Sequence, residues 1–422
     1  MANQIEMRLS TKTFWVLLTC FSYCFLSQVK GQKIIPIDTS NVQILRIDPS
    51  NATGGNASEI FKSIKYIPLQ TTKESLFGKI GQLEITDQYF IILDQSTNSI
   101  LFFNKDGTYH HKIKGGNPDF GAQSFDKLNL IRETNELVFL ENNKGLTYVF
   151  LDFTGKKTRE IKYDFNTKLQ FMDYKFLSKD ELISSNPYDP EIIDGKQTKF
   201  LLEYVKSFHD VYASAFPFKP SLYKNRYDSY MFNNFTYTGT DTAFFYVKPN
   251  EYNIFKVSKN CIAHTYKLVL PLQYALPESL IADSTISSEI KQETIRNKGY
   301  VSRIGEFYQL GDNLAFHLYS YRNQGLEDDL IYNLKTGNLI AYNHILTDES
   351  TYFLPITENK LDKSGFLNAK SNHAYLQFSS LEMFNSHKEN KDKNIKYSPA
   401  LERYFATESY YSNPVLLQVS FK

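Results

Sequence analysis

The feature that most constrains the fold is a pattern that the chain repeats after 47 or 48 residues. Residues 90–113 contain three β-type runs joined by polar turns, FIILD, ILFF and TYHHKI, and residues 137–163 contain LVFLE, LTYVF and KKTREIKY in the same order. The repeat places Gly155 48 residues after Gly107. A unit of this length with three or four short strands is typical of a propeller blade, because helical repeats show a 3.6-residue periodicity instead.

Later parts of the chain contain strand-like runs of the same kind, which we interpret as blades three to six. They lie in residues 181–205, 242–270, 313–345 and 373–422. Aromatic residues make up 15% of the chain, and bulky rings suit half-buried pleated surfaces. The sequence therefore predicts an all-β protein, a six-bladed β-propeller over residues 59–422.

Two segments interrupt this pattern. Residues 277–300 are polar and rich in Ser and Glu, with acidic residues early and basic residues late, which predicts a small helical insertion between the fourth and fifth blades. This insertion is either a lid over a ligand face or a passive decoration. Residues 385–399 are densely charged and are interpreted as a solvated loop. The short apolar run LEMF before them is compatible with a helix. We also expect strand 64–69 to pair with residues 413–422 and close the ring.

The N-terminal residues 1–31 have the pattern of a secretory signal peptide, followed by an N-terminal extension over residues 32–58. A basic start precedes an apolar stretch of about 13 residues, which is shorter than the ~20 that a permanent membrane helix needs. Two alternatives remain open, a lipid anchor at Cys20 or Cys24 and an ordinary buried helix. We expect an exported protein of the periplasm or cell surface, without a membrane span.

Charge and cysteine content exclude several classes of function. The chain has 47 Lys and Arg against 46 Asp and Glu, so no net field favours nucleic acid. Once the signal is removed, Cys261 is the remaining cysteine, and one thiol forms neither an intrachain disulfide nor a Cys-based zinc site. The sequence motifs of phosphate-binding loops and serine hydrolases are also absent.

One family resemblance adds to this interpretation. Residues 59–113, above all the entry YIPLQTT followed by GKI, resemble the first blade of a largely uncharacterised family of six-bladed β-propellers, secreted or lipid-anchored proteins of Bacteroidetes. The terminal NPVLLQVSFK resembles that family's last strand. The resemblance implies the fold and export, but no catalytic residues. In place of the family's Gly-rich segment this chain has GGNPDFGAQSF at 115–125, without its acidic end.

The histidines and acidic residues predict no metal site and no cofactor. His110 and His111 are adjacent on a predicted strand, so alternation places them on opposite faces. The other histidines, His317 among them, have no metal-ligand spacing. The acidic residues that recur at blade turns are expected to cap hairpins rather than to ring a channel around Ca²⁺. They are Asp94, Asp106, Asp152 and Glu141.

The candidate ligand-binding residues lie in the aromatic stretch 216–237, where Phe and Tyr alternate with Lys, Arg and Asn. They are Phe218, Tyr223, Arg226, Tyr227 and Tyr230. Rings that stack on sugar faces beside polar groups suit a glycan or peptide groove, although inter-blade packing explains such rings equally. We therefore expect a non-enzymatic binding propeller that engages a glycan, a peptide or a partner protein. The alternatives are a lyase-like or lactonase-like enzyme with a channel-centred site and a purely structural role.

Overall fold

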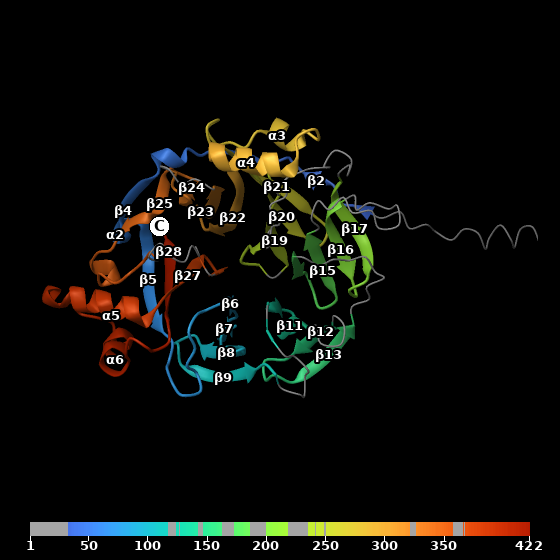
Figure 1. Ribbon diagram of the computed structural model, residues 1–422. Coiled ribbons are helices and arrows are strands. Elements are labelled where there is room, and N and C mark those ends of the chain that lie inside the picture. Colours follow the sequence, from blue (N-terminus) through green and yellow to red (C-terminus); the bar gives the residue numbers. More distant parts are fainter. Residues whose placement is uncertain are drawn as a thin grey trace, which may run out of the picture. The chain divides into compact units, whose positions relative to one another are not determined.

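Six β-sheets surround a central axis in the computed structural model (Figure 1), and they all belong to one compact unit, Ile34–Lys422. The residues that the structure describes are 33–116, 124–125, 127–141, 147–162, 173–185, 200–217, 235–240, 242–248, 250–320, 326–357, 366 and 368–422. The signal peptide predicted for residues 1–31 lies outside them and stays a prediction.

The first two blades are the repeated meanders of the sequence. Blade one consists of β6 (Gln82–Ile85), β7 (Tyr89–Asp94), β8 (Ser99–Asn104) and β9 (Tyr109–Lys114), and blade two of β10 (Asn129–Ile131), β11 (Glu136–Glu141), β12 (Thr147–Leu151) and β13 (Lys157–Lys162). In both sheets the strands are antiparallel and follow chain order outward from the axis. The predicted repeat is confirmed.

Blades three to five also lie where the sequence predicts them. Blade three contains β14 (Asp173–Phe176), β15 (Glu181–Ser185), β16 (Phe200–Lys206) and β17 (Asp210–Pro217). Blade four contains β18 (Phe235–Tyr237), β19 (Ala243–Val247), β20 (Asn253–Ser258) and β21 (Ile262–Val269). Blade five contains β22 (Val301–Leu310), β23 (Asn313–Ser320), β24 (Asp329–Asn333) and β25 (Leu339–Leu346).

Blade six joins the two ends of the propeller. Its strands are β26 (Asn368–Lys370), β27 (His373–Phe378), β28 (Val415–Phe421) and, from the other end of the chain, β5 (Phe61–Pro68). The pairing of β28 with β5 is antiparallel and sets Leu416 opposite Ile67. The predicted ring closure is therefore confirmed, and the six-bladed fold with it.

The segment before β5 runs along the outer edges of blades three, four and five, beginning where the backbone N–H of Ile35 donates to the carbonyl of Ser214 in β17 at 2.9 Å. Its elements are β1 (Lys33–Ile34), β2 (Ile37–Asp38), β3 (Gln43–Arg46), the 3₁₀ turn η1 (Pro49–Asn51), β4 (Thr53–Asn56) and α2 (Ala57–Ile60). Strands β2 and β3 pair in parallel with β21, and β4 pairs in parallel with β25. Added outer strands cover sheet edges that otherwise present unpaired N–H and C=O groups.

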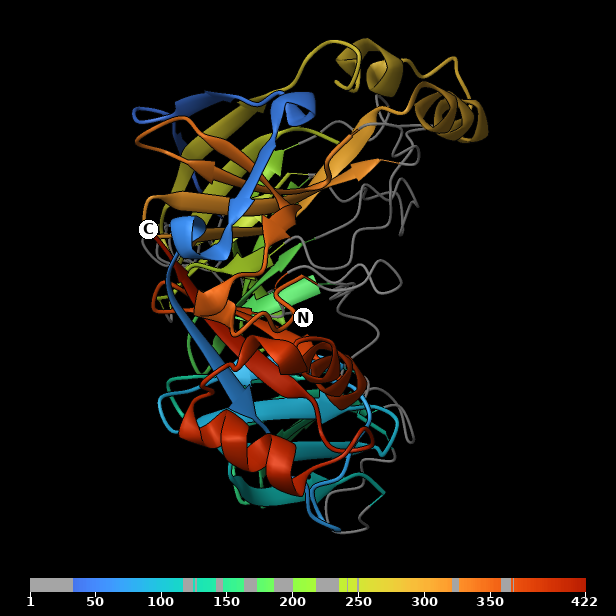
Figure 2. The same cartoon turned by 90° about the vertical axis from the view of Figure 1, so that its left-hand side faces the viewer.

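The insertion between blades four and five forms two helices, α3 (Glu278–Ala282) and α4 (Ser288–Lys298), as predicted. The Ser287 side chain accepts a hydrogen bond from the backbone of Ile290 at the start of α4, and Gly299 ends the helix with a φ of 68°. Figure 2 shows the two gold helices beyond the ends of the strands. Ile281 and Ile295 pack with Leu276 in a small cluster of their own.

The expectation of a solvated loop over residues 385–399 is wrong for part of that range. The chain forms α5 (Ser380–Glu389), a 3₁₀ turn η4 (Lys391–Lys393) and α6 (Pro399–Thr407) in this part of blade six. Another 3₁₀ turn, η3 (Glu349–Thr351), lies earlier in the chain, between β25 and β26. Ser379 and Glu382 form a capping box at the start of α5. Met383 and Leu401 are fully buried against blade six, so packing supports these charged helices.

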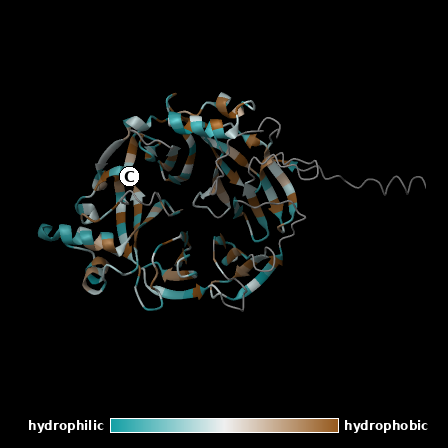
Figure 3. Ribbon diagram, in the orientation of Figure 1, coloured by the Kyte–Doolittle hydropathy of each residue, from teal (hydrophilic) through white to brown (hydrophobic). Residues whose placement is uncertain are grey.

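The core consists of apolar layers between neighbouring blades. Figure 3 shows the outer strand β9 mostly teal. Aromatic rings fill several layers, as between blades two and three, where Tyr148 and Phe150 contact Phe208 at ring-centroid distances of 4.9 and 5.6 Å. This packing explains the aromatic content of the sequence.

Candidate functional site

The ligand-binding residues predicted from the sequence lie outside the described residues. Phe218, Tyr223, Arg226, Tyr227 and Tyr230 all fall between β17 and β18, in residues 218–234. Their role stays a prediction, and we sought a site among the residues that the structure describes.

The expectation that His110 and His111 point to opposite faces is wrong. A β-bulge between β8 and β9 pairs Phe102 with His111 but Phe103 with Tyr109, so His110 is an extra residue. The Nδ1 atoms of the two histidines are 2.6 Å apart. His111 stacks on Phe102 with 4.2 Å between ring centroids and bonds through Nε2 to the Phe153 carbonyl. Its ring therefore has a packing role, and burial lowers its pKa.

The recurring aspartates cap turns, as predicted. Asp94 accepts hydrogen bonds from the backbone and hydroxyl groups of Ser96 and Thr97. Asp106 and Asp152 accept the equivalent bonds two residues later, from Thr108 and Thr154. Glu141, the fourth predicted position, is the last residue of β11.

The central channel contains paired charges of both signs. Arg132, just after β10, donates to the carbonyl of Ile85 at 2.7 Å and to the Glu84 carboxylate at 2.9 Å. Its guanidinium also lies 4.5 Å from the ring centre of Tyr237 on the inner strand of blade four. Arg132 therefore connects blades one, two and four near the axis.

A second pair lies beside it, where Lys127 contacts the buried Asp173 at 3.2 Å. Lys175 follows on the same strand, β14. Burial lowers the pKa of the Lys175 amine, Lys127 and Arg132 lower it further, and Asp173 and Glu84 oppose them. The metal-dependent enzyme alternative requires a ring of carboxylates or histidines around a channel metal, whereas the described residues near Arg132 and Lys127 are paired charges of both signs.

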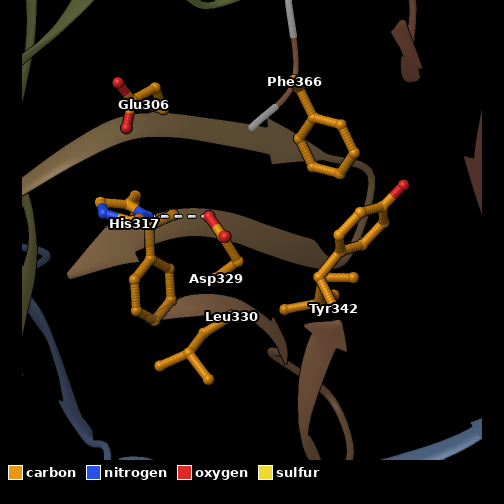
Figure 4. Close-up of a pocket in the computed structure, with 8 residues that line it drawn as sticks. Glu306, His317, Asp329, Leu330, Tyr342 and Phe366 are labelled. Carbon is orange, nitrogen blue, oxygen red and sulfur yellow. Dashed lines mark hydrogen bonds and ion pairs between the residues drawn. The ribbon is translucent and has the colours of Figure 1, made fainter. Parts of the chain in front are cut away.

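A pocket in blade five faces blade six and brings together carboxylates, an imidazole and aromatic rings. It encloses about 300 Å³ of space that includes open solvent. Figure 4 shows the side chains that define it, Glu306, His317, Asp329, Leu330, Tyr342 and Phe366. These residues come from all four strands of blade five and from the segment before β26.

A bulge in the inner strand turns Glu306 into this pocket. The pairing of β22 with β23 shifts between Gly305 and Tyr308, and Glu306 has a φ of 42°. A Cβ atom at position 305 would lie 2.5 Å from the Tyr319 ring, so a side chain does not fit there. The Tyr319 hydroxyl donates to the Glu306 carboxylate at 2.6 Å, which fixes the carboxylate.

His317 and Asp329 face each other across β23 and β24. They are register partners, and His317 Nδ1 lies 2.8 Å from the Asp329 carboxylate. Burial lowers the pKa of His317, but the hydrogen bond to Asp329 and the charges of Asp329, Glu306 and Asp328 outweigh it, so the pKa is raised. Only 8% of the His317 side chain is exposed.

The wall of the pocket near the helical insertion consists of an arginine, a tyrosine and a histidine in contact with one another. The Arg303 guanidinium lies 3.6 Å from the ring centre of Tyr319, and that ring meets His317 edge-on at 4.4 Å. Burial and the Glu306 carboxylate raise the pKa of Tyr319, so the phenol stays protonated and donating. The next residue, Ser320, donates to the carbonyl of Gly299 at 3.0 Å and links this wall to the end of α4.

The opposite wall is aromatic. Tyr342 meets Phe366 edge-on at 5.4 Å, and the Tyr342 hydroxyl donates to the carbonyl of Ile356. Both rings contact the core between blades five and six. The pocket thus combines two fixed carboxylates and an imidazole with an apolar aromatic surface.

Sequence reasoning missed this pocket because its residues are unremarkable along the chain. His317 is 12 residues from Asp329, and no metal or catalytic motif has that spacing. The missing signal was the hairpin register, which sets a histidine near the end of β23 opposite an acidic residue at the start of β24.

In the part of the chain that the structure describes, no helix combines the length and the apolar character needed to span a membrane. A family model described as a domain of unknown function, DUF4934, matches residues 42–420. Among solved structures, a "putative exported protein" from Bacteroides fragilis aligns with a TM-score of 0.60 and 16% identity, over 90% of this chain and 100% of that chain. A DUF4221 member from Bacteroides vulgatus aligns with a TM-score of 0.43 and 9% identity, over 86% and 98%. No curated protein sequence matches.

Proposed function

Because this chain belongs to the DUF4934 family, whose description assigns no activity, we propose its function from the pocket: an exported, non-enzymatic binding propeller that takes a glycan residue between blades five and six. The observation that carries this proposal is the juxtaposition of fixed carboxylates, Glu306 and Asp329, with the rings of Tyr342 and Phe366 in one cavity. A peptide or a partner protein is the other ligand expected from the sequence.

The chemistry of the walls favours a sugar. Carboxylates accept hydrogen bonds from hydroxyl or amino groups, and aromatic faces pack against the C–H faces of a pyranose ring. The space of about 300 Å³ includes open solvent, so the enclosed part is smaller, and we expect it to admit part of one terminal sugar residue rather than a long chain.

Export to the periplasm or cell surface is part of the proposal. The secretory pattern of residues 1–31 supports it, as does the printed name of the Bacteroides fragilis protein. The single cysteine of the mature chain, Cys261, is exposed, so the fold does not depend on an oxidising compartment.

A glycan array with the purified full-length mature chain tests this proposal. We expect binding to a limited set of glycans, and Glu306→Gln should weaken that binding at least tenfold because a neutral amide accepts fewer and weaker hydrogen bonds. Glu160→Gln on the outer strand β13 is the matched control and should bind as the wild type does. Absence of any bound glycan, or equal binding by Glu306→Gln, contradicts the proposal.

One observation favours the enzyme alternative. A buried histidine hydrogen-bonded to a carboxylate is the unit that general-base catalysis uses, and His317 with Asp329 has this geometry. Turnover of lactone or uronate-containing substrates by the wild type, and its loss in His317→Gln with glycan binding retained, would support this alternative over simple binding.

A further inference from the structure

The geometry points to a divalent metal site at the edge of this pocket, held by His317 and Asp329, which line it, and by the neighbouring Asp328. Each residue offers one ligand atom, and these atoms lie within 4.8 Å of one another. The inference rests on these side chains alone and does not depend on a glycan ligand.

The separation of the ligand atoms suits a single small ion. A tetrahedral zinc ion with ligands at 2.0–2.1 Å separates their atoms by roughly 3.4 Å. The 2.8 Å contact of His317 Nδ1 with Asp329 would have to open slightly and any wider separation, at most 4.8 Å, would have to close, which small rotations of the two carboxylates allow. The histidine needs little change because its ring is already held by Tyr319 and by the strand pairing. Ligands on rigid strands lose little freedom when they bind an ion.

Two further observations point to a cation rather than to a cluster of exposed acids. The imidazole is buried, with 8% of its side chain exposed, and it faces a cavity with room for an ion and its remaining ligand. Glu306 lines the same cavity from the inner strand. Three carboxylates around one imidazole concentrate negative charge, which a divalent ion compensates.

The ligand types select the ion. Imidazole nitrogen with carboxylate oxygen suits Zn²⁺ or Mn²⁺, whereas Ca²⁺ and Mg²⁺ prefer oxygen ligands throughout. Three protein ligands leave an open position toward the cavity, where a water molecule or a hydroxyl of a bound ligand completes the coordination. An ion placed there would also strengthen the binding of a polar ligand.

The test uses the tag-free mature chain, stripped with a chelator and titrated with Zn²⁺ alone and Mn²⁺ alone. We expect one equivalent of one of these ions by elemental analysis, a calorimetric binding isotherm and a rise in the thermal midpoint. Asp328→Asn should weaken binding at least tenfold, and His317→Gln more. His209→Gln, which removes an exposed histidine elsewhere, should change nothing.

Less than one tenth of an equivalent of either ion, or unchanged affinity in Asp328→Asn, overturns the inference. If His317→Gln fails to fold, the visible absorption of the Co²⁺-loaded wild type serves instead, and a spectrum without imidazole coordination is equally decisive. Failure to bind any glycan while one equivalent of ion is bound would reject the proposed function and leave the metal site standing.

Discussion

At the scale of single residues, the turns show how the sequence encodes the repeat. In blade one the turn from Asn104 to Gly107 joins β8 to β9, and in blade two the turn from Asp152 to Gly155 joins β12 to β13. Both glycines have left-handed φ values, 90° and 86°, and both backbone N–H groups bond to the first residue of the turn. These positions were predictable because the turn chemistry is local.

Gly107 also has a long-range role that the sequence did not reveal. A Cβ atom there would lie 2.2 Å from the carbonyl oxygen of Pro68 at the end of β5. The next residue but one after Pro68, Gln70, donates its backbone N–H to the Gly107 carbonyl at 2.9 Å. The turn of blade one is therefore pressed against the strand that closes blade six.

We predict that Gly107→Ala lowers the free energy of unfolding by about 3 kcal/mol, because the alanine meets both an unfavourable φ and a backbone clash. Gly311→Ala is the matched control. Its φ is also positive, at 64°, but no atom lies within 4 Å of the added Cβ, so a cost of about 1 kcal/mol is expected. Urea denaturation of both variants measures the difference. Equal losses of unfolding free energy in the two variants would show that β5 moves to accommodate the new methyl group.

At the scale of elements, prediction succeeded where the signal is local and failed where it is not. The middle strands of the first two blades are short apolar runs with turns at both ends. By contrast, β2, β3 and β4 pair with strands roughly 220 to 290 residues later, and no local pattern specifies an outer parallel partner. The run LEMF at the start of α5 is compatible with a helix, but the rest of α5 and all of α6 were missed, because the dense charge was given more weight than the helix caps at Ser379 and Ser398.

The candidate site shows the same limit. A bulge redirects Glu306, and hairpin register joins His317 to Asp329, so both depend on how strands pair rather than on which residues are neighbours in the chain. The helical insertion was predictable as helix, since its caps and charges are local, but its link to the pocket through Ser320 was not.

The insertion gives a prediction at this scale. Its two ends meet, since the backbone N–H of Val301 donates to the carbonyl of Tyr274 at 2.8 Å, so a short Gly-Ser bridge can replace residues 278–299. We expect the shortened protein to fold with little loss of thermal stability, because the helices have a small apolar cluster of their own. If the insertion is a lid, glycan affinity should change several-fold on the array.

Ser320→Ala is the control for this deletion, because it removes only the hydrogen bond to Gly299 and keeps both helices. Affinity that is identical in the shortened protein and the wild type would assign the insertion a passive role. If glycan affinity changes equally in the shortened protein and in Ser320→Ala, the effect belongs to the hydrogen bond between Ser320 and Gly299.

At the scale of the whole molecule, the ring is closed by contacts between the two ends of the propeller. The closing strand was predictable because the last repeat supplies too few strands for a blade, and residues 64–69 provide the missing one. Asn413, which is fully buried, adds to the closure. Its side chain donates to the carbonyls of Gln70 and Ser75 and accepts from the backbone of Phe77.

The last prediction concerns this closure. Removing residues 413–422 deletes β28, leaves β27 and β5 without their shared partner and exposes two sheet edges, so we expect the loss of a single cooperative unfolding transition. A milder change, Asn413→Ala, leaves two buried backbone groups and one part-buried carbonyl without that partner and should lower the free energy of unfolding by about 2 to 4 kcal/mol. Gln418→Ala, on the half-buried face of β28, should cost less than about 1 kcal/mol. Circular dichroism melts and urea titrations measure all three. An unchanged melting temperature in the truncated chain would contradict this prediction. The cooperativity of unfolding would then come from the five other blades rather than from closure of the ring by β28.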